Sequence, residues 1–311
     1  MYRVDDHARR QSWFGLKRFV KRFLALRAPN ASLRLVSKVK PSLRSGRLPA
    51  PARLIEVTGL VGGIPFVMLD PARCENAKEL FWGRGRRPKA HDRLALDTVA
   101  VLARESDTFL DVGAYTGLFT MAVTAYAPHV AVHAFEIVPA VADALEANAR
   151  RNGVDDRVAI HREGIGDPNK TMRVPSGEGG SALPSFYSSR MRFDGGKEVD
   201  FRSLDSVAAL IPEAAGVVMK VDVEGTEDAV FRFGQAFLRT CRPHILCEVL
   251  HDVADGAALD GLLAGARLHK YLVTDTRLAR IDRVVPHPAF RDWLFTPLTE
   301  AELRGLELPV D

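Results

Sequence analysis

The sequence predicts an α/β fold with a mostly parallel sheet and helices on both faces. From residue 108 onward, strand-like apolar runs alternate with helical runs, a glycine turn joins the first strand to the first helix, and several strands end in acidic residues. Alternation of this kind is typical of a parallel sheet covered by helices on both sides. We therefore expect a ligand at the carboxyl ends of the strands.

Composition indicates a globular protein with an unusually basic beginning. Hydrophobic residues make up 47% of the 311 positions, and the formal net charge is +4. The three cysteines, Cys74, Cys241 and Cys247, show neither a disulfide framework nor zinc-ligand spacing. No apolar run reaches the roughly 20 residues of a membrane span, and no secretory signal is recognisable. We expect a protein of the reducing cytoplasm.

Residues 1–50 are predicted to form a basic amphipathic arm and linker. Apolar residues between Ser12 and Leu26 recur at three- and four-residue spacing with Lys and Arg between them, as in a basic helix. Such a helix could contact an anionic membrane surface, here the inner one, or an acidic partner. The alternative is that its apolar stripe packs on the rest of the chain. Nucleic-acid binding is not expected, because no readout motif accompanies the basic residues.

A second unit, residues 51–107, is predicted to lead into the core. Arg53–Thr58 and Ile64–Leu69 are β-prone runs joined by a glycine-rich segment, Gly59–Gly63, which predicts a hairpin. A helix is expected over Asp92–Arg104.

Residues 108–311 are predicted to form the ligand-binding domain. The expected strands are Thr108–Val112, Val130–Glu136, Val158–Arg162, Val217–Asp222, Ile245–Val249, Tyr271–Thr274 and Trp293–Thr296. The expected helices are Leu118–Tyr126, Ala140–Arg151, Glu227–Arg239 and Ala257–Ala266. A Gly- and Ser-rich stretch, Pro175–Gly196, interrupts the alternation between the short strands Thr171–Val174 and Glu198–Arg202. It is interpreted as a lid or acceptor-recognition loop.

The segment Phe109–Thr120 indicates a nucleotide-binding turn. Gly113 permits a tight turn and close approach of a ligand, and Gly117 permits close packing at the helix start. About 25 residues later, Glu136 ends the second strand, where a carboxylate can accept hydrogen bonds from ribose hydroxyls. Tyr115 stands where dinucleotide-binding turns carry a second glycine, and its side chain would crowd a pyrophosphate. This favours S-adenosylmethionine, an adenosine ligand without phosphate.

Polar residues also follow the fourth and fifth strands. Asp222 and Glu224 follow the fourth, Glu248 ends the fifth, and His251 comes shortly after. Asp222 and His251 are our candidates for a general base, with Glu224 as a third catalytic candidate. Alternatively, Asp222, Glu224 and Glu248 could bind a hard divalent ion such as magnesium, or Glu224 could cap the following helix. Lys220, inside an apolar strand, is expected to form an ion pair.

Several segments together resemble the FkbM-type methyltransferase family. They are Phe109–Gly117, His133–Pro139, Ser203–Asp205, Met219–Glu227 and Pro243–Glu248. The resemblance implies a class I methyltransferase (Rossmann-like) fold with a seven-stranded sheet whose last strand is antiparallel. It implies S-adenosylmethionine as cofactor, with Glu136 at the ribose, Ile165 at the adenine, and the methionine end near Asp111, Gly113 and Gly117, with Ala114 and Tyr115 in the same turn. Tyr115 replaces a small polar residue, often Asn.

The resemblance also implies an O-methyltransferase acting on hydroxyl groups of a sugar, glycoconjugate or secondary metabolite. Its partner would then be a small-molecule or glycan acceptor. Two other interpretations remain open from the residues. One is an NAD-dependent oxidoreductase, which uses a similar turn and acid. The other is a non-catalytic methyltransferase-like scaffold that binds a membrane surface or a partner through its basic arm.

Overall fold

The fold is known from a computed structural model that describes Leu26, residues 48–174 and residues 196–310. The predicted basic helix, apart from Leu26, and most of the arm 1–50 therefore lie outside the described residues. The predicted lid Pro175–Gly196 does so too, apart from Gly196. In the part of the chain that the structure describes, no helix has the length and apolar character of a membrane span.

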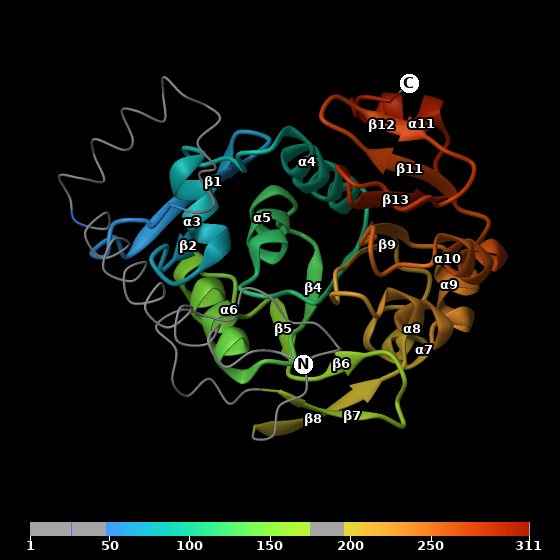
Figure 1. Cartoon of the computed structure of the whole chain (residues 1–311), viewed down its shortest axis with the longest axis horizontal. Helices are drawn as coiled ribbons and strands as arrows, with labels where there is room; N and C mark the ends of the chain where they lie inside the picture. The colour runs from blue at the N-terminus through green and yellow to red at the C-terminus, as the bar shows by residue number, and fades with distance from the viewer. Residues whose placement is uncertain (1–25, 27–47, 175–195, 311) are drawn as a thin grey trace, which may run out of the picture.

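The centre of the fold is an eight-stranded sheet in the order β12-β11-β13-β10-β9-β3-β4-β5 (Figure 1). Its strands are β3 Thr108–Val112, β4 Ala131–Phe135, β5 Val158–His161, β9 Val217–Val221, β10 His244–Glu248, β11 His269–Val273, β12 Leu278–Arg280 and β13 Asp292–Thr296. The five strands from β10 to β5 are parallel, whereas β13 runs antiparallel to both of its neighbours. The predicted mostly parallel sheet with an antiparallel last strand is confirmed.

The predicted count of seven strands is wrong by one. The additional strand, β12, has three residues and pairs antiparallel with β11 at the edge of the sheet. The turn that leads into it is closed by hydrogen bonds between Thr274 and Arg277. So short a strand contains too few residues to show an alternating pattern, and only its pairing with β11 defines it.

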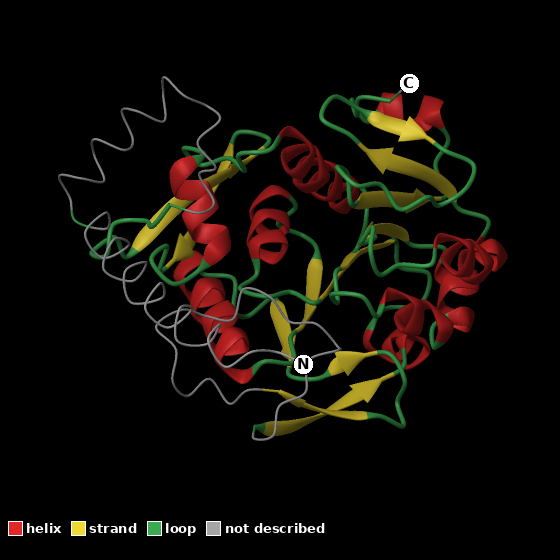
Figure 2. Cartoon of the chain, in the orientation of Figure 1, coloured by secondary structure: helices red, strands yellow, loops and turns green. Residues whose placement is uncertain are grey.

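Helices cover both faces of this sheet, and two separate apolar clusters hold them there (Figure 2). One face is covered by α4 Ala90–Arg104, α5 Leu118–Tyr126 and α6 Pro139–Asn152. The other is covered by α7 Leu204–Val207, the 3-10 turn η2 Ala208–Leu210, α8 Glu227–Arg232, α9 Gln235–Cys241, α10 Gly256–Leu263 and the 3-10 turn η3 Ala264–Ala266. A last helix, α11 Glu300–Gly305, follows β13.

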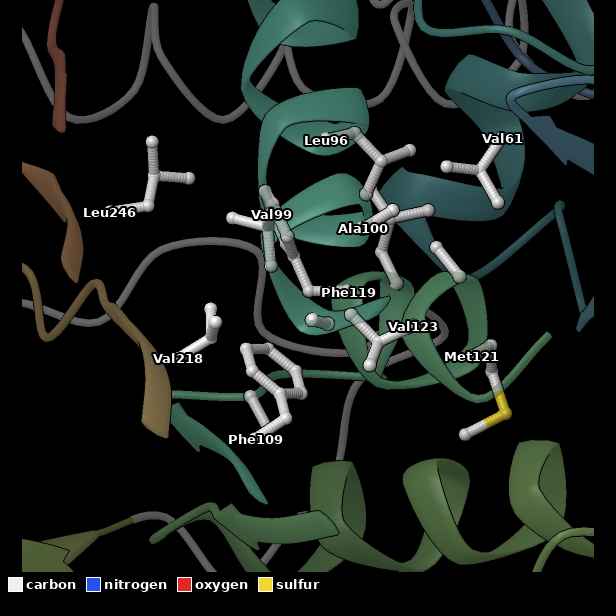
Figure 3. Close-up of a cluster of buried hydrophobic side chains, with 14 of the residues drawn as sticks. Val61, Leu96, Val99, Ala100, Phe109, Phe119, Met121, Val123, Val218 and Leu246 are labelled. Atoms are coloured by element: carbon white, nitrogen blue, oxygen red, sulfur yellow. The ribbon is translucent and has the colours of Figure 1, made fainter. Parts of the chain in front are cut away.

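Side chains of each strand alternate between these two clusters. In β3, Phe109 belongs to the cluster under α4 and α5, and the next residue, Leu110, belongs to the opposite one. Figure 3 shows Val99 of α4 near Phe109 and Val218, which come from neighbouring strands. Because both faces are buried, the central strands are apolar at nearly every position, which explains why they are recognisable in the sequence.

The predicted hairpin is confirmed, with β1 at Glu56–Val61 and β2 at Ile64–Leu69 joined by Gly62 and Gly63. Its first strand starts later than predicted and includes Gly59. Residue 59 must be glycine, because the ring of Phe66 on the paired strand occupies the space that a side chain would need. The hairpin packs on α5 and α6, and the Asn148 side chain accepts the N–H of Leu69. An unpredicted helix, α3 Glu75–Trp82, follows.

The single helix predicted over Glu227–Arg239 is wrong, because the structure has two helices there. α8 ends at Arg232, and α9 starts at Gln235 with Gly234 as its N-cap. A side chain at Gly234 would collide with Leu204 of α7, and the Asp205 carboxylate accepts the N–H of Phe237 at 2.8 Å. The break is therefore imposed by contact with α7.

A small three-stranded sheet lies beside the carboxyl end of β5. It has the order β6-β8-β7, formed by Gly164–Ile165, Lys197–Arg202 and Thr171–Val174 respectively. The predicted short strands on either side of the loop 175–196 are thus confirmed.

Candidate functional site

A cavity of about 380 Å³ lies at the carboxyl ends of the parallel strands. Residues that directly follow β3, β4 and β9 line it, together with Glu248 at the end of β10. β3 is the strand at which the order reverses, since β4 and β5 lie on one side of it and β9 and β10 on the other. This is where parallel α/β sheets bind ligands, and the volume is of the size that small-molecule sites have.

The predicted glycine turn has the backbone conformation that the sequence indicates. Gly113 has φ +77°, and a Cβ there would lie 1.9 Å from the carbonyl oxygen of Asp222 in the neighbouring strand end. Gly117, with φ +83°, is the N-cap of α5, and a Cβ there would lie 2.2 Å from Leu145 of α6. Both positions need glycine for backbone conformation and for close packing.

Tyr115 also has a left-handed backbone, with φ +50°. Asn adopts this conformation more readily than other side chains do, which gives a physical reason for the Asn that the family resemblance implies at this position. The tyrosine ring packs partly against the apolar cluster under α5 and also lines the cavity. It narrows the site next to the turn.

Glu136 lines the cavity, and both of its carboxylate oxygens accept hydrogen bonds from the backbone. One oxygen accepts the N–H of Tyr115 at 2.9 Å and the other accepts the N–H of Val138 at 2.8 Å. Each carboxylate oxygen can accept a second hydrogen bond, so both remain available to a pair of hydroxyl groups. Burial raises the pKa of Glu136 to about 7, and this effect is larger than that of the two backbone hydrogen bonds, which lower the pKa.

The other predicted cofactor residues divide into two groups. Gly113, Ala114, Tyr115, Glu136 and Ile165 line the cavity, whereas Asp111 and Gly117 do not. Asp111 is fully buried, and its Oδ2 accepts both the N–H and the hydroxyl of Thr120 in α5, at 3.1 and 2.6 Å. These hydrogen bonds hold the first turn of α5 against β3 and so fix the two elements that the glycine turn connects.

Three predicted acids that line the cavity converge beside the glycine turn. Carboxylate oxygens of Asp222, Glu224 and Glu248 lie within 4.8 Å of one another. Lys220, buried at the end of β9, lies 3.1 Å from Asp222 and donates to the carbonyl of Gly113 at 3.0 Å. The predicted ion pair of Lys220 is thus confirmed. Burial opposes ionisation of Asp222, but the Lys220 ammonium outweighs it and the pKa of Asp222 is lowered.

The other two acids of this group bind protons more tightly. Burial and the neighbouring Asp222 raise the pKa of Glu224 to about 7 and that of Glu248 to about 9. Arg291 pairs with Glu248 at 3.0 Å. At neutral pH, Asp222 is therefore ionised, Glu224 is about half protonated and Glu248 is protonated.

Glu224 does not cap the following helix, so that alternative is wrong. The N-cap of α8 is Thr226, and it is the Glu227 carboxylate that accepts the N–H groups of Val223 and Gly225. Glu224 instead lines the cavity and has φ +57°, a strained conformation for a residue with a side chain.

The two candidate bases are placed differently. Asp222 lines the cavity beside the glycine turn, whereas His251 is not among the lining residues. The His251 side chain is half exposed, and its Nδ1 lies 2.9 Å from the carboxylate of its neighbour Asp252. Of the two, only Asp222 is in a position to meet a ligand in this cavity.

The arrangement of charges bears on the magnesium alternative. Magnesium and calcium take about six oxygen ligands, and three carboxylates would supply part of such a set. Here, however, Lys220 pairs with the ionised Asp222, and Glu248, which contacts Arg291, has a pKa of about 9 and is protonated at neutral pH. The residues present fit an internally balanced carboxyl cluster better than a dedicated metal site.

Several lining residues were not predicted from the sequence. They are Glu75, Asn76 and Glu79 of α3, Arg87 of the loop after it, and Arg291 before β13. These positions belong to no motif. α3 has only eight residues, and its buried residues Ala77, Leu80, Phe81 and Trp82 cover little more than one helical turn, which is too short for a periodic pattern to be recognised in the sequence.

The raised pKa values predict how stability depends on pH. Glu136, Glu224 and Glu248 bind their protons more tightly in the folded chain than at their ordinary pKa of 4.5. The free energy of unfolding of the ligand-free chain should therefore fall as pH rises from about 4.5, up to about 7 for the first two and about 9 for Glu248.

Thermal unfolding at pH 6 and pH 8.5 measures this effect. Glu248→Gln, which replaces the protonated carboxyl by a neutral group of the same shape, should show a smaller loss of stability across this interval than the unaltered chain. An identical loss in the two proteins would contradict the role assigned to Glu248.

The strand order and the position of the cavity at the strand ends define a class I methyltransferase fold. Residues 111–274 match the model of the methyltransferase FkbM domain, which is more than half of the chain. The chain belongs to this family, as its resemblance in sequence implied. No curated protein matches the chain.

Solved structures of methyltransferases are similar to this chain at low sequence identity. Methyltransferase FkbM from Methylobacillus flagellatus KT is 18% identical with a TM-score of 0.42, over 61% of this chain and 44% of that one. The O-methyltransferase from Bacillus cereus in complex with SAH is 12% identical with a TM-score of 0.38, over 66% of this chain and 79% of that one. The chain thus spans less than half of the FkbM structure that it matches.

Proposed function

We propose that this protein transfers a methyl group from S-adenosylmethionine to a hydroxyl oxygen, on a sugar, glycoconjugate or secondary metabolite. The observation that carries the proposal is the cavity itself. Glu136 and the glycine turn line it, together with an ionised Asp222 beside that turn. Membership of the FkbM family supports it independently.

The residues at the centre of the cavity suit the cofactor. The two free acceptor positions on the Glu136 carboxylate match the two hydroxyls of a ribose, and Ile165 offers an apolar surface for the adenine ring. The methionine end would lie along the backbone of Gly113, Ala114 and Tyr115. Bound there, S-adenosylmethionine supplies an electrophilic methyl group on a positively charged sulfur.

The protein itself must orient the acceptor and take up its proton. A hydroxyl ionises far above neutral pH, so a positioned carboxylate that accepts the proton as the C–O bond forms lowers the barrier. Asp222 meets this need, because Lys220 keeps it ionised and holds it beside Gly113. The proton ends on the Asp222 carboxyl, next to the partly buried Glu224, and the methyl group would leave the sulfur for the acceptor oxygen, so that S-adenosylhomocysteine remains.

Isothermal titration with S-adenosylhomocysteine tests the cofactor assignment directly. Binding is expected in the micromolar range, and NADH, the ligand of the oxidoreductase alternative, should not bind. Absence of S-adenosylhomocysteine binding at millimolar concentration would refute the proposal. A chelator should leave turnover unchanged, because the carboxyl cluster is balanced by Lys220 and Arg291.

The pKa of Glu136 makes cofactor affinity depend on pH. Ribose hydroxyls donate to the ionised carboxylate, but in the ligand-free chain the pKa of Glu136 is about 7. Below that pH the carboxyl must release a proton when the ligand binds. The Kd for S-adenosylhomocysteine should therefore rise by about fivefold between pH 7 and pH 6 and change little above pH 8. Titrations at these values measure it, and Glu136→Gln should abolish the pH dependence.

A further inference from the structure

The acceptor end of the cavity has a wall that lies outside the family-matched residues 111–274. It consists of α3, which contributes Glu75, Asn76 and Glu79, and of Arg87, which follows α3 in the chain. We call this set the α3 wall. The family-matched residues supply the glycine turn, Glu136 and the carboxyl cluster, whereas the α3 wall and Arg291 lie outside the match.

The α3 wall is fixed at both of its ends. At its start, the Sγ of Cys74, the N-cap of α3, lies 3.1 Å from the hydroxyl of Thr116 in the glycine turn. At its end, Arg87 lies 3.1 Å from Glu79 and 3.4 Å from Asp92 of α4. The wall is therefore a rigid surface held at a set distance from the turn, as a site that selects its ligand by shape and charge requires.

The α3 wall faces the carboxyl-cluster end of the sheet. Arg87 lies close enough to Asp292 of β13 to affect the pKa of that carboxyl, and Asp292 is the partner of Glu248 in the pairing of β13 with β10. At the other end of α3, Glu75 is near Tyr115. An acceptor whose hydroxyl reaches Asp222 would thus lie between the wall and the carboxyl cluster.

The charges that line the cavity are strongly unequal. Seven acids and three bases are among its described lining residues, namely Glu75, Glu79, Glu136, Glu163, Asp222, Glu224 and Glu248 against Arg87, Lys220 and Arg291. Each of these bases lies 3.0 to 3.1 Å from a carboxyl group of the lining. An anionic acceptor would have to displace one of these carboxyl groups from its cation, and it would meet the ionised Asp222 in a partly buried site.

We propose that the α3 wall selects the methyl acceptor, and that it takes a neutral or amine-bearing hydroxyl compound rather than one that carries a phosphate or carboxylate. This inference rests on the proposed function and narrows it. Neutral hydroxyl groups can accept from Asn76 and donate to Glu75 and Glu79, and an ammonium group would be attracted by the excess of acids.

The test uses the full chain and radiolabelled S-adenosylmethionine. A small-molecule extract of cells that encode the chain is divided at pH 7 into the part that an anion exchanger retains and the part that it does not. Label is expected in the unretained part. Label that enters only the retained part would overturn the proposal. Failure of the unaltered chain to bind S-adenosylhomocysteine would instead refute the proposed function.

Variants of α3 test the wall with the fraction that accepts label. Asn76→Ala and Glu79→Gln should each raise by about tenfold the amount of that fraction needed for half-maximal rate, while the Kd for S-adenosylhomocysteine stays within about twofold. Arg73→Gln is the matched control, because Arg73 lies just before α3, pairs with Asp70 at 3.6 Å and does not line the cavity. Identical values for Asn76→Ala, Glu79→Gln and the control would show that α3 does not select the acceptor.

Discussion

Replacing Asp222 by Asn is expected to reduce methyl transfer by about 10²- to 10⁴-fold, the range that a general base contributes. Asp222 is the ionised acid of the carboxyl cluster, and Asn can still accept a hydrogen bond from Lys220 but cannot take up the proton of the acceptor. The Kd for S-adenosylhomocysteine should change only a few fold, since Asp222 lies beyond the glycine turn from Glu136. Steady-state kinetics and titration calorimetry measure the two quantities.

Glu248→Gln is the matched control for this substitution. The pKa of Glu248 is about 9, so its carboxyl is protonated at neutral pH and the amide resembles it in charge and shape. Its turnover should remain well above that of Asp222→Asn. Retained activity in Asp222→Asn, or an equal loss in both variants, would remove Asp222 from its role as base.

Replacing Gly113 by Ala is expected to abolish cofactor binding and to destabilise the fold by roughly 3 kcal/mol or more. A left-handed backbone alone costs a residue with a Cβ about 1–2 kcal/mol. At Gly113, with φ +77°, the methyl group would also lie 1.9 Å from the carbonyl oxygen of Asp222. Either the turn or the end of β9 must move, and both carry residues of the cavity.

Gly153→Ala separates the cost of the left-handed backbone from the cost of the collision with Asp222. Gly153 also has a left-handed backbone, with φ +66°, but nothing lies within 4 Å of the Cβ that would be added. This variant should lose only the conformational part, about 1 kcal/mol, and should bind S-adenosylhomocysteine normally. Thermal unfolding and calorimetry of the two variants, side by side, measure the difference. Normal ligand binding by Gly113→Ala would contradict the close approach of the turn to Asp222.

The sequence by itself determined the core of the fold and the centre of the cavity. The central strands are buried on both faces, so their apolar runs are continuous. The glycine turn follows β3, and Glu136 follows the next strand, β4. Features of this kind depend on the local chain and on the period of the strand. They place Gly113, Glu136 and Asp222 at one edge of the sheet before any tertiary contact is known.

Only the tertiary structure decided what each polar side chain meets. The Asp111 carboxylate accepts a hydrogen bond from Thr120 of α5 and does not reach the cavity, whereas Asp222, which follows the neighbouring strand β9, lines the cavity. His251 is close to the cluster in sequence but points to Asp252 and does not line the cavity. The sequence allows either Glu224 or Glu227 to accept hydrogen bonds from the backbone at the start of α8. In the structure it is Glu227 that accepts them, from the N–H groups of Val223 and Gly225.

The same is true of the α3 wall, whose helix is too short to show a period and whose position depends on contacts with Thr116 and Asp92. Partners far apart along the chain are chosen by packing geometry, which a sequence pattern does not contain. Local periodicity therefore determined where the cofactor site lies in this protein. Long-range packing decided which acids are ionised there and which surface faces the acceptor.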